Sequence, residues 1–180
     1  MKEEVELVQK AQRGERESFG MLYETYLPKI YRFVYLKVSH RGDAEDITHQ
    51  VFMKAWENIG SFRFQGFPFS SWLYRIAQNA VIDFYRTSKP SLSLEETNES
   101  DLGKDDTRET AFDTKEELRE IMKAVKKLKP DEQSVVIMRF VDELSNREAA
   151  LALGKTEGAV RVIQHRALKQ LRKHIEHDTS

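Results

Sequence analysis

Apolar residues recur every three or four positions along nearly the whole of this 180-residue chain. That spacing places them on one face of an α-helix, whereas no segment shows the strict alternation of a half-buried strand. The pattern therefore predicts an all-α fold. The expected helices cover residues 3–12, 17–38, 43–58 and 70–86, then 131–141, 145–153 and 156–175.

Two of the predicted helices carry a further expectation. Pro28 lies inside the 17–38 helix, where a missing N–H and a bulky ring should kink the helix or split it in two. The helix over 70–86 is expected to bury one stripe, formed by Trp72, Ile76, Ala80 and Phe84.

The charge is distributed unevenly, although the net charge is only -1. Residues 87–117 hold four basic and ten acidic side chains, whereas residues 118–180 hold thirteen basic and nine acidic ones. Few large apolar residues occur over 87–113, so this segment reads as a flexible acidic linker. We therefore expect two small helical domains, over 1–86 and 114–180, with the linker over 87–113 and helicity resuming near Thr114.

The sharpest local pattern is a helix-turn-helix over 145–168. Ser145 and Glu148 have the spacing of a capping box, Gly154 is suited to the left-handed end of the first helix, and Thr156 is placed to cap the second. In the second helix, Val160 and four further apolar residues form the expected buried stripe, namely Ile163, Ala167, Leu168 and Leu171.

The opposite side of that helix is basic, with six Lys or Arg residues and one acid between Lys155 and Lys173. Such a helix can enter a major groove, where Arg and Gln read base edges and Lys meets phosphates. An ordinary amphipathic surface helix is the alternative. The candidate DNA-contacting residues are Thr156, Arg161, Gln164, His165, Arg166 and Lys169.

Two features of the N-terminal part leave their role open. The loop over 60–69 holds four phenylalanines, Phe62, Phe64, Phe67 and Phe69, which either stack on unpaired bases or plug the core. The helix over 43–58 starts with Asp43, Glu45 and Asp46, which either complement the helix dipole or pair with a partner's arginines.

Three stretches of the chain together resemble the extracytoplasmic function (ECF) sigma factors of RNA polymerase, which keep only regions 2 and 4. The first is Asp43-Ala44-Glu45-Asp46-Ile47 with Val51-Phe52 and Ala55-Trp56; the second is Trp72-Leu73-Tyr74-Arg75-Ile76-Ala77 with Asn79, Asp83 and Arg86. The third runs from Leu128 and Pro130 through Met138-Arg139-Phe140, Leu144-Ser145 and Leu153-Gly154 to Val160-Arg161 and Arg166.

The resemblance implies a transcription initiation factor whose partners are core RNA polymerase and promoter DNA, with an anti-sigma protein as a further candidate partner. Region 4 would bind the double-stranded −35 element through the basic helix. Region 2 would bind the single-stranded −10 element through the loop over 60–71 and the helix after it, and would open the duplex. The implied −10 residues are Phe64, Phe67, Ser71, Arg75 and Asn79, and the implied polymerase-binding residues are Asp43, Asp46 and Gln50.

Other classes of protein find little support. The chain has no cysteine and no phosphate-binding glycine loop, so we expect no cofactor, no metal and no enzymatic activity; His174 and His177 lack companion ligands. A simple helix-turn-helix regulator is the main alternative, but it leaves the 43–86 block without a use. The acidic N-terminus and the absence of a long apolar run favour a cytoplasmic protein with no membrane insertion.

Overall fold

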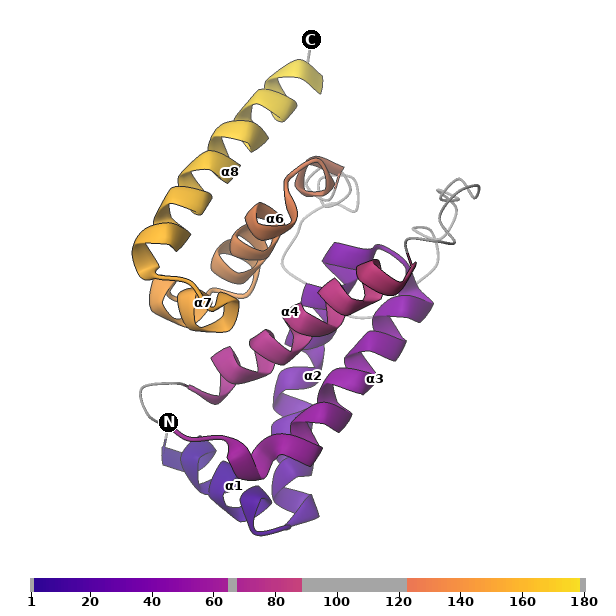
Figure 1. Cartoon of the computed structure of the whole chain (residues 1–180), viewed down its shortest axis with the longest axis vertical. Helices are drawn as coiled ribbons and strands as arrows, with labels where there is room; N and C mark the ends of the chain where they lie inside the picture. The colour runs from indigo at the N-terminus through magenta and orange to yellow at the C-terminus, as the bar shows by residue number, and fades with distance from the viewer. Residues whose placement is uncertain (1, 65–67, 89–122, 179–180) are drawn as a thin grey trace.

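The computed structural model describes residues 2–64, 68–88 and 123–178, and within these ranges the all-α prediction is confirmed (Figure 1). The predicted linker beyond Ser88 and the helix expected near Thr114 lie outside the described residues. The first four α-helices are α1 (Lys2–Gln12), α2 (Arg16–Val38), α3 (Arg41–Asn58) and α4 (Phe69–Ser88), with a 3-10 turn η1 (Ile59–Ser61) after α3. The later elements are α6 (Pro130–Val136), the π-helical turn η3 (Ile137–Val141), α7 (Asn146–Leu153) and α8 (Glu157–Asp178).

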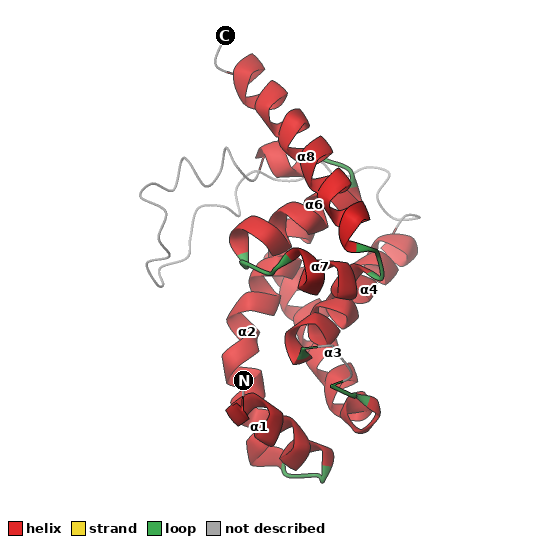
Figure 2. Ribbon diagram, turned by 90° about the vertical axis from the view of Figure 1, so that its left-hand side faces the viewer, coloured by secondary structure: helices red, strands yellow, loops and turns green. Residues whose placement is uncertain are grey.

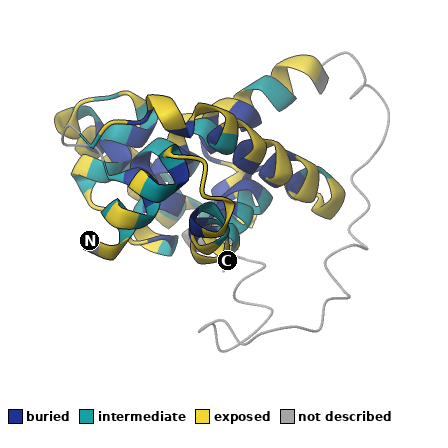
Figure 3. Cartoon of the chain, turned by 90° about the horizontal axis from the view of Figure 1, so that it is seen from below, coloured by how far each residue is buried: buried dark blue, intermediate teal, exposed yellow. Residues whose placement is uncertain are grey.

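Helices α1 to α4 form one bundle, in which α2 contacts each of the other three (Figure 1). The buried residues lie where the helices face one another, and the exposed ones lie on the outside (Figure 3). Ile30 and Phe33 of α2, Val51 of α3 and Leu73 of α4 are fully enclosed or nearly so. The ring of Phe33 meets that of Tyr74 edge to face, with 5.4 Å between centroids. These contacts give the first half of the chain a core of its own.

Helix α2 is continuous through Pro28, so the predicted split does not occur. Tyr26 and Ile30, which flank the proline, are both buried, whereas Pro28 itself is exposed. Packing on either side holds the helix together despite the lost hydrogen bond. The helix ends at Ser39, which takes a left-handed conformation (φ 60°) and donates its N–H to Tyr35 O at 2.8 Å.

The predicted stripe of α4 needs correction. Ala80 is buried, but Trp72, Ile76 and Phe84 are only partly so. The enclosed side chains lie one or two positions further along, at Leu73, Tyr74, Ala77 and Val81. The reason is that α4 packs against α2 and α3 on one side and against α7 on another, which turns and widens its buried arc.

The second bundle begins where Pro130 starts α6 and the carboxylate of Glu132 accepts the Lys129 N–H at 3.1 Å. The helix then widens into the π-helical turn η3, closed by a bond from Asp142 N to Ile137 O at 3.0 Å. A π-turn holds one residue more than an α-turn and is often found at functional positions.

The helix-turn-helix prediction agrees with the geometry in detail. Ser145 Oγ accepts the Glu148 N–H at 3.1 Å, and Glu148 accepts the Ser145 N–H at 2.7 Å. Gly154 is left-handed (φ 63°), and Thr156 Oγ1 accepts the Ala159 N–H at 3.1 Å. In α8, Val160 and Ala167 are buried and Ile163 and Leu171 partly so. Leu168 is instead 43% exposed, because the neighbouring helices do not reach that side of α8.

The two bundles contact each other. Helix α7 lies against α4, and η3 touches α2 (Figure 2). Asp142 and Lys37 are buried in this contact, with exposed fractions of 8% and 7%. Every helix in the described part of the chain is too short or too polar to span a bilayer.

The left-handed Gly154 provides a test of the turn. A Cβ at this position would meet only Arg75 Nη2, at 3.9 Å, so Gly154→Ala creates backbone strain without a clash. We expect the variant to unfold more easily by about 1–2 kcal/mol in urea denaturation. Gly158→Ala is the matched control: it lies in the first turn of α8 with similar open space, and should be neutral or stabilising by up to about 1 kcal/mol. Equal effects of the two changes would contradict the strained turn.

Candidate nucleic-acid and polymerase interfaces

The basic helix α8 presents most of its predicted DNA-contacting side chains to solvent. Arg161, His165, Arg166 and Lys169 are all exposed. Arg161 contacts Glu157 at 3.5 Å, and both side chains of this pair are largely solvated. Exposed pairs of this kind contribute little free energy, so the guanidinium is free to exchange Glu157 for another acceptor.

Two of the predicted DNA-contacting residues, Thr156 and Gln164, already make side-chain hydrogen bonds within the protein. The hydroxyl of Thr156 is occupied in capping α8, which leaves it one remaining lone pair and its proton for a ligand. Gln164 is partly buried, and its side-chain oxygen accepts from Arg139 Nε at 3.4 Å.

Arg139 is a residue that the sequence analysis did not assign to this interface. It lies in η3, donates to the carbonyl of Leu144 and also reaches Gln164. It therefore ties the start of the helix-turn-helix to the partly buried Gln164 of α8. Its place in the Met138-Arg139-Phe140 motif was the available signal, but only the fold shows which partner it meets.

A cleft of about 430 Å³ lies between the end of α3 and the middle of α4. This volume falls in the range of small-ligand sites. Arg75 and Asn79 line it together with Trp72, so the structure brings two of the predicted −10 residues to one place. The other lining side chains are Lys54, Asn58, Ser61, Ile76 and Asp83. Sequence reasoning missed Lys54 and Asn58 because they come from the end of α3, remote in sequence from α4.

Of the other predicted −10 residues in the described part of the chain, neither Ser71 nor Phe64 lines this cleft. Ser71 is 1% exposed, and its hydroxyl points into the protein with no hydrogen-bond partner, so it does not reach the cleft. Phe64 is partly buried against Phe62, with ring centroids 4.8 Å apart. Phe67 lies outside the described residues.

The phenylalanines of the loop therefore divide into core and periphery. Phe62 is 3% exposed and contacts the rings of Phe64, Phe69 and Trp72. Phe69 is 1% exposed, so it too is part of the core. For Phe62 and Phe69 the structure supports the alternative that their rings pack in the core of the domain.

The three predicted polymerase-binding residues come together. Asp43, Asp46 and Gln50 line a second cleft of about 310 Å³ between α3 and α4. Asp43 lies 3.1 Å from the ring of His40 at the start of α3. Lys54 and Asp83 line both clefts, so the two are neighbours on one face of the bundle.

The comparisons with known proteins match both halves of the chain. Residues 22–90 match the family model of sigma-70 region 2, and residues 118–171 match that of sigma-70 region 4. The ECF RNA polymerase sigma factor SigW of Bacillus subtilis is 31% identical over 93% of this chain and 94% of its own length. The chain belongs to the ECF sigma factors. Membership of the family makes it a transcription initiation factor that binds RNA polymerase and directs it to promoters.

Further relatives agree with this assignment. The ECF sigma factor BldN of Streptomyces coelicolor is 36% identical over 97% of this chain, which spans 66% of the BldN length. Two solved structures, each 22% identical, share the fold: CnrH in complex with the cytosolic domain of CnrY (TM-score 0.73, 96% of both chains), and the sigma factor RpoE in complex with the anti-sigma factor NepR from Bartonella quintana (TM-score 0.71, 89% of this chain and 98% of that one).

Membership of the family also covers the part of the chain that a simple helix-turn-helix regulator would leave without a use. Such a regulator would account for α7 and α8 alone, whereas the region 2 match over residues 22–90 also covers α3 and α4, which line both clefts. In the described part of the chain, no three His, Asp or Glu side chains are grouped as metal ligands. His174 is described and partly buried, and the side chain of His177 lies outside the described residues.

The division of the loop aromatics can be tested by unfolding. Replacing Phe62 by Ala removes a ring packed against three others, so the free energy of unfolding should fall by about 3–5 kcal/mol in urea. Phe64→Ala removes a ring that lies at the edge of the same cluster and should cost less than half as much. Similar losses for the two variants would contradict the burial of Phe62.

Proposed function

We propose that this sigma factor reads the −35 element with α8 and binds the opened −10 strand in the cleft lined by Trp72, Arg75 and Asn79. The observation that carries the proposal is that each half of the chain holds a separate solvent-open surface of the required chemistry. One is a basic helix that follows a capped turn; the other is a cleft with an aromatic ring, an amide and cations.

The side chains of α8 suit the readout of a DNA major groove. Arginine matches guanine and glutamine matches adenine through paired hydrogen bonds in the major groove. Arg161 and Gln164 lie one turn apart near the start of α8, the end of a recognition helix that normally meets the bases. Lys169 and Lys173 lie further along and would meet phosphates, which set register and affinity instead of sequence preference.

The cleft between α3 and α4 offers groups that can offset the cost of opening DNA. A base that leaves the duplex loses its stacking, at a cost of a few kcal/mol, and needs a protein surface in return. The partly exposed ring of Trp72 offers a stacking face, the amide of Asn79 offers a donor and an acceptor, and Arg75 offers a phosphate partner. Phe64 packs on Phe62, which in turn contacts Trp72, so Phe64 is proposed to border the same site. Phe67 lies outside the described residues and stays a sequence-based proposal.

The position and charge of the second cleft suit a contact with polymerase. Asp43, Asp46 and Gln50 form an acidic rim on the second cleft, beside the proposed −10 cleft. An acidic rim complements basic side chains of a partner. A polymerase bound there would hold region 2 with its −10 cleft alongside.

The remaining parts of the proposal follow from this assignment. The domains are taken as 1–86 for region 2, 87–113 for the linker and 114–180 for region 4. The protein would act in the cytoplasm, where it meets its polymerase and DNA. Since RpoE of Bartonella quintana is described in complex with an anti-sigma factor, such a protein is a candidate regulator here as well.

The −35 role predicts different consequences for two basic residues of α8. Arg161→Ala should weaken promoter binding by about 1–3 kcal/mol and relax the preference at one base pair. Lys173→Ala should weaken binding to all sequences alike and reduce its salt dependence. Footprints and competition binding with the reconstituted holoenzyme measure both. Full −35 preference in the Arg161→Ala holoenzyme would remove this residue from the readout.

The −10 role predicts that binding and opening are separable. Asn79→Ala removes an exposed cleft amide, so the closed complex should form while permanganate reactivity of −10 thymines falls. A premelted template should restore transcription in part, because the opening energy is supplied beforehand. Gln9→Ala, which removes an exposed amide from α1, is the control. Wild-type permanganate reactivity in Asn79→Ala would exclude this residue from strand capture.

A further inference from the structure

An apolar residue lies at the centre of the exposed face of α8. Val162 is 50% exposed, whereas Val160, two residues earlier and of the same type, is 0% exposed. Successive residues of an α-helix are about 100° apart, so Val162 lies about 200° round the helix from Val160. Val162 is therefore almost directly opposite the side of α8 that packs on the rest of region 4.

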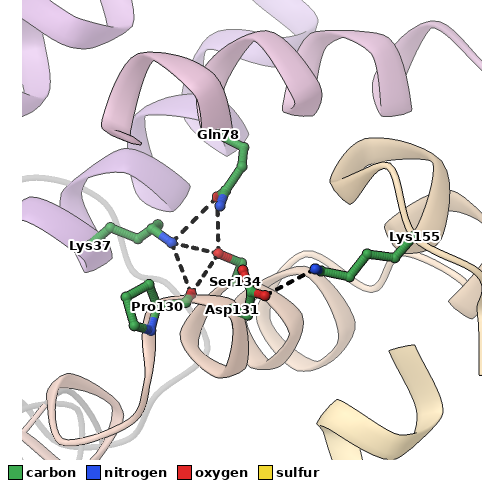
Figure 4. Close-up of polar contacts among 6 residues, drawn as sticks. All are labelled: Lys37, Gln78, Pro130, Asp131, Ser134 and Lys155. Carbon is green, nitrogen blue, oxygen red and sulfur yellow. Dashed lines mark hydrogen bonds and ion pairs between the residues drawn. The ribbon is translucent and has the colours of Figure 1, made fainter. Parts of the chain in front are cut away.

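Polar contacts with α6 fix which side of α8 is open to solvent. Nζ of Lys155, just before α8, lies 3.0 Å from Asp131 Oδ2 of α6 (Figure 4). Further along, Gln170 Nε2 donates to Glu132 Oε1 of α6 at 3.3 Å. These two contacts hold α8 at both ends of its packed side, so the face that contains Val162 is set before any ligand binds.

The side chains that surround Val162 are basic. Arg161 comes directly before it, His165 and Arg166 lie about one turn after it, and Lys169 lies two turns after it on the same side; all four are exposed. A single exposed valine is ordinary on most protein surfaces. This valine lies among cations that attract a polyanion, so it faces whatever nucleic acid they bind.

The beginning of the same face allows a close approach of the backbone. Gly158, one turn before Val162, is exposed, and a Cβ at this position would meet only Thr156 Oγ1, at 3.9 Å. A valine side chain is short, so it reaches a base edge only where the helix backbone comes near the floor of the groove. The lack of a side chain at Gly158 leaves that approach unobstructed.

The major groove offers an apolar side chain one suitable partner. The C5-methyl group of thymine is the apolar group at that edge of the base pairs, and the other groups there are hydrogen-bond donors and acceptors. Valine has no hydrogen bond to offer, so an amino group or a carbonyl against it would lose water without compensation. Contact with a methyl group instead removes apolar surface of both partners from water.

We propose that Val162 is a specificity-determining residue of α8, which selects a thymine in the −35 element through contact with its C5-methyl group. The inference rests on the proposed function, because it requires α8 to lie in the major groove. Arg161 and Arg166 supply charge and hydrogen bonds on either side, whereas Val162 discriminates at one base pair.

Deoxyuridine provides a direct test, because it pairs as thymine does but lacks the methyl group. The promoter is one found by sequencing transcripts made in vitro with the reconstituted holoenzyme. Each thymine of its −35 element, on either strand, is replaced singly by deoxyuridine, and holoenzyme binding is measured by competition. We expect one replacement to weaken binding about three- to fivefold, the effect of leaving one methyl group unburied.

Variants at Val162 show whether that loss depends on this side chain. Val162→Ala should bind the thymine and deoxyuridine templates equally, because its single methyl group does not reach the base. Val162→Thr keeps one of the two methyl groups in nearly the same shape and should retain part of the discrimination. Since residue 162 is exposed and alanine favours helices, urea denaturation should show no loss of stability in Val162→Ala.

Leu168→Ala is the matched control. It removes another exposed apolar side chain from α8, 43% exposed, that lies about 120° round the helix from Val162. The Leu168→Ala holoenzyme should discriminate thymine from deoxyuridine as the wild type does.

Two results would overturn the role of Val162. One is a penalty for deoxyuridine that Val162→Ala leaves intact at every thymine. The other is an equal weakening of both templates by Val162→Ala, which would indicate a contact with something other than the methyl group.

The same measurements distinguish this inference from the proposed function. If Arg161→Ala relaxes the −35 preference while Val162→Ala leaves the deoxyuridine penalty unchanged, the role of Val162 is wrong and α8 still reads the element. If neither variant changes −35 preference and no deoxyuridine weakens binding, α8 does not read the −35 element, and both proposals for this helix fail.

Discussion

The packing of α4 on two sides organises the rest of the molecule. Leu73, Ala77 and Val81 are enclosed in the region 2 bundle, and Tyr74 meets Phe33 there while lying close to Asp142 of region 4. Burial, followed by the charge of Asp142, raises the pKa of Tyr74. Because the remaining side of α4 lines the proposed −10 cleft, little of this helix can change without affecting a core, a domain contact or a DNA surface.

Local signals were sufficient to predict much of the fold. The capping pair Ser145 and Glu148, the left-handed Gly154 and the capping Thr156 act within a few residues of themselves, so their geometry is legible in the sequence. The same holds for the bounds of most helices, which differ from expectation by a few residues at most.

Features that depend on distant partners were not predictable in this way. The buried stripe predicted for α4 was wrong in part, because the spacing of apolar residues does not reveal that α7 covers a second side of this helix. Leu168 was predicted to be buried on spacing alone but is 43% exposed. The buried position of Ser71, a predicted −10 residue, was also not visible in the sequence. Lys37 reads in the sequence as an ordinary surface lysine; only the fold places it among Gln78 and Ser134.

The π-helical turn η3 has a consequence for how these functions are connected. One extra residue in a helix rotates everything after it by about 100°. Within the turn and just beyond it, Arg139 faces Gln164 of α8, while Asp142 faces Arg32 of α2. Restoring regular α-helical winding by deleting one residue would turn these two side chains relative to each other. A single turn of backbone thereby sets the orientation of the proposed −35 helix relative to the contact with α2.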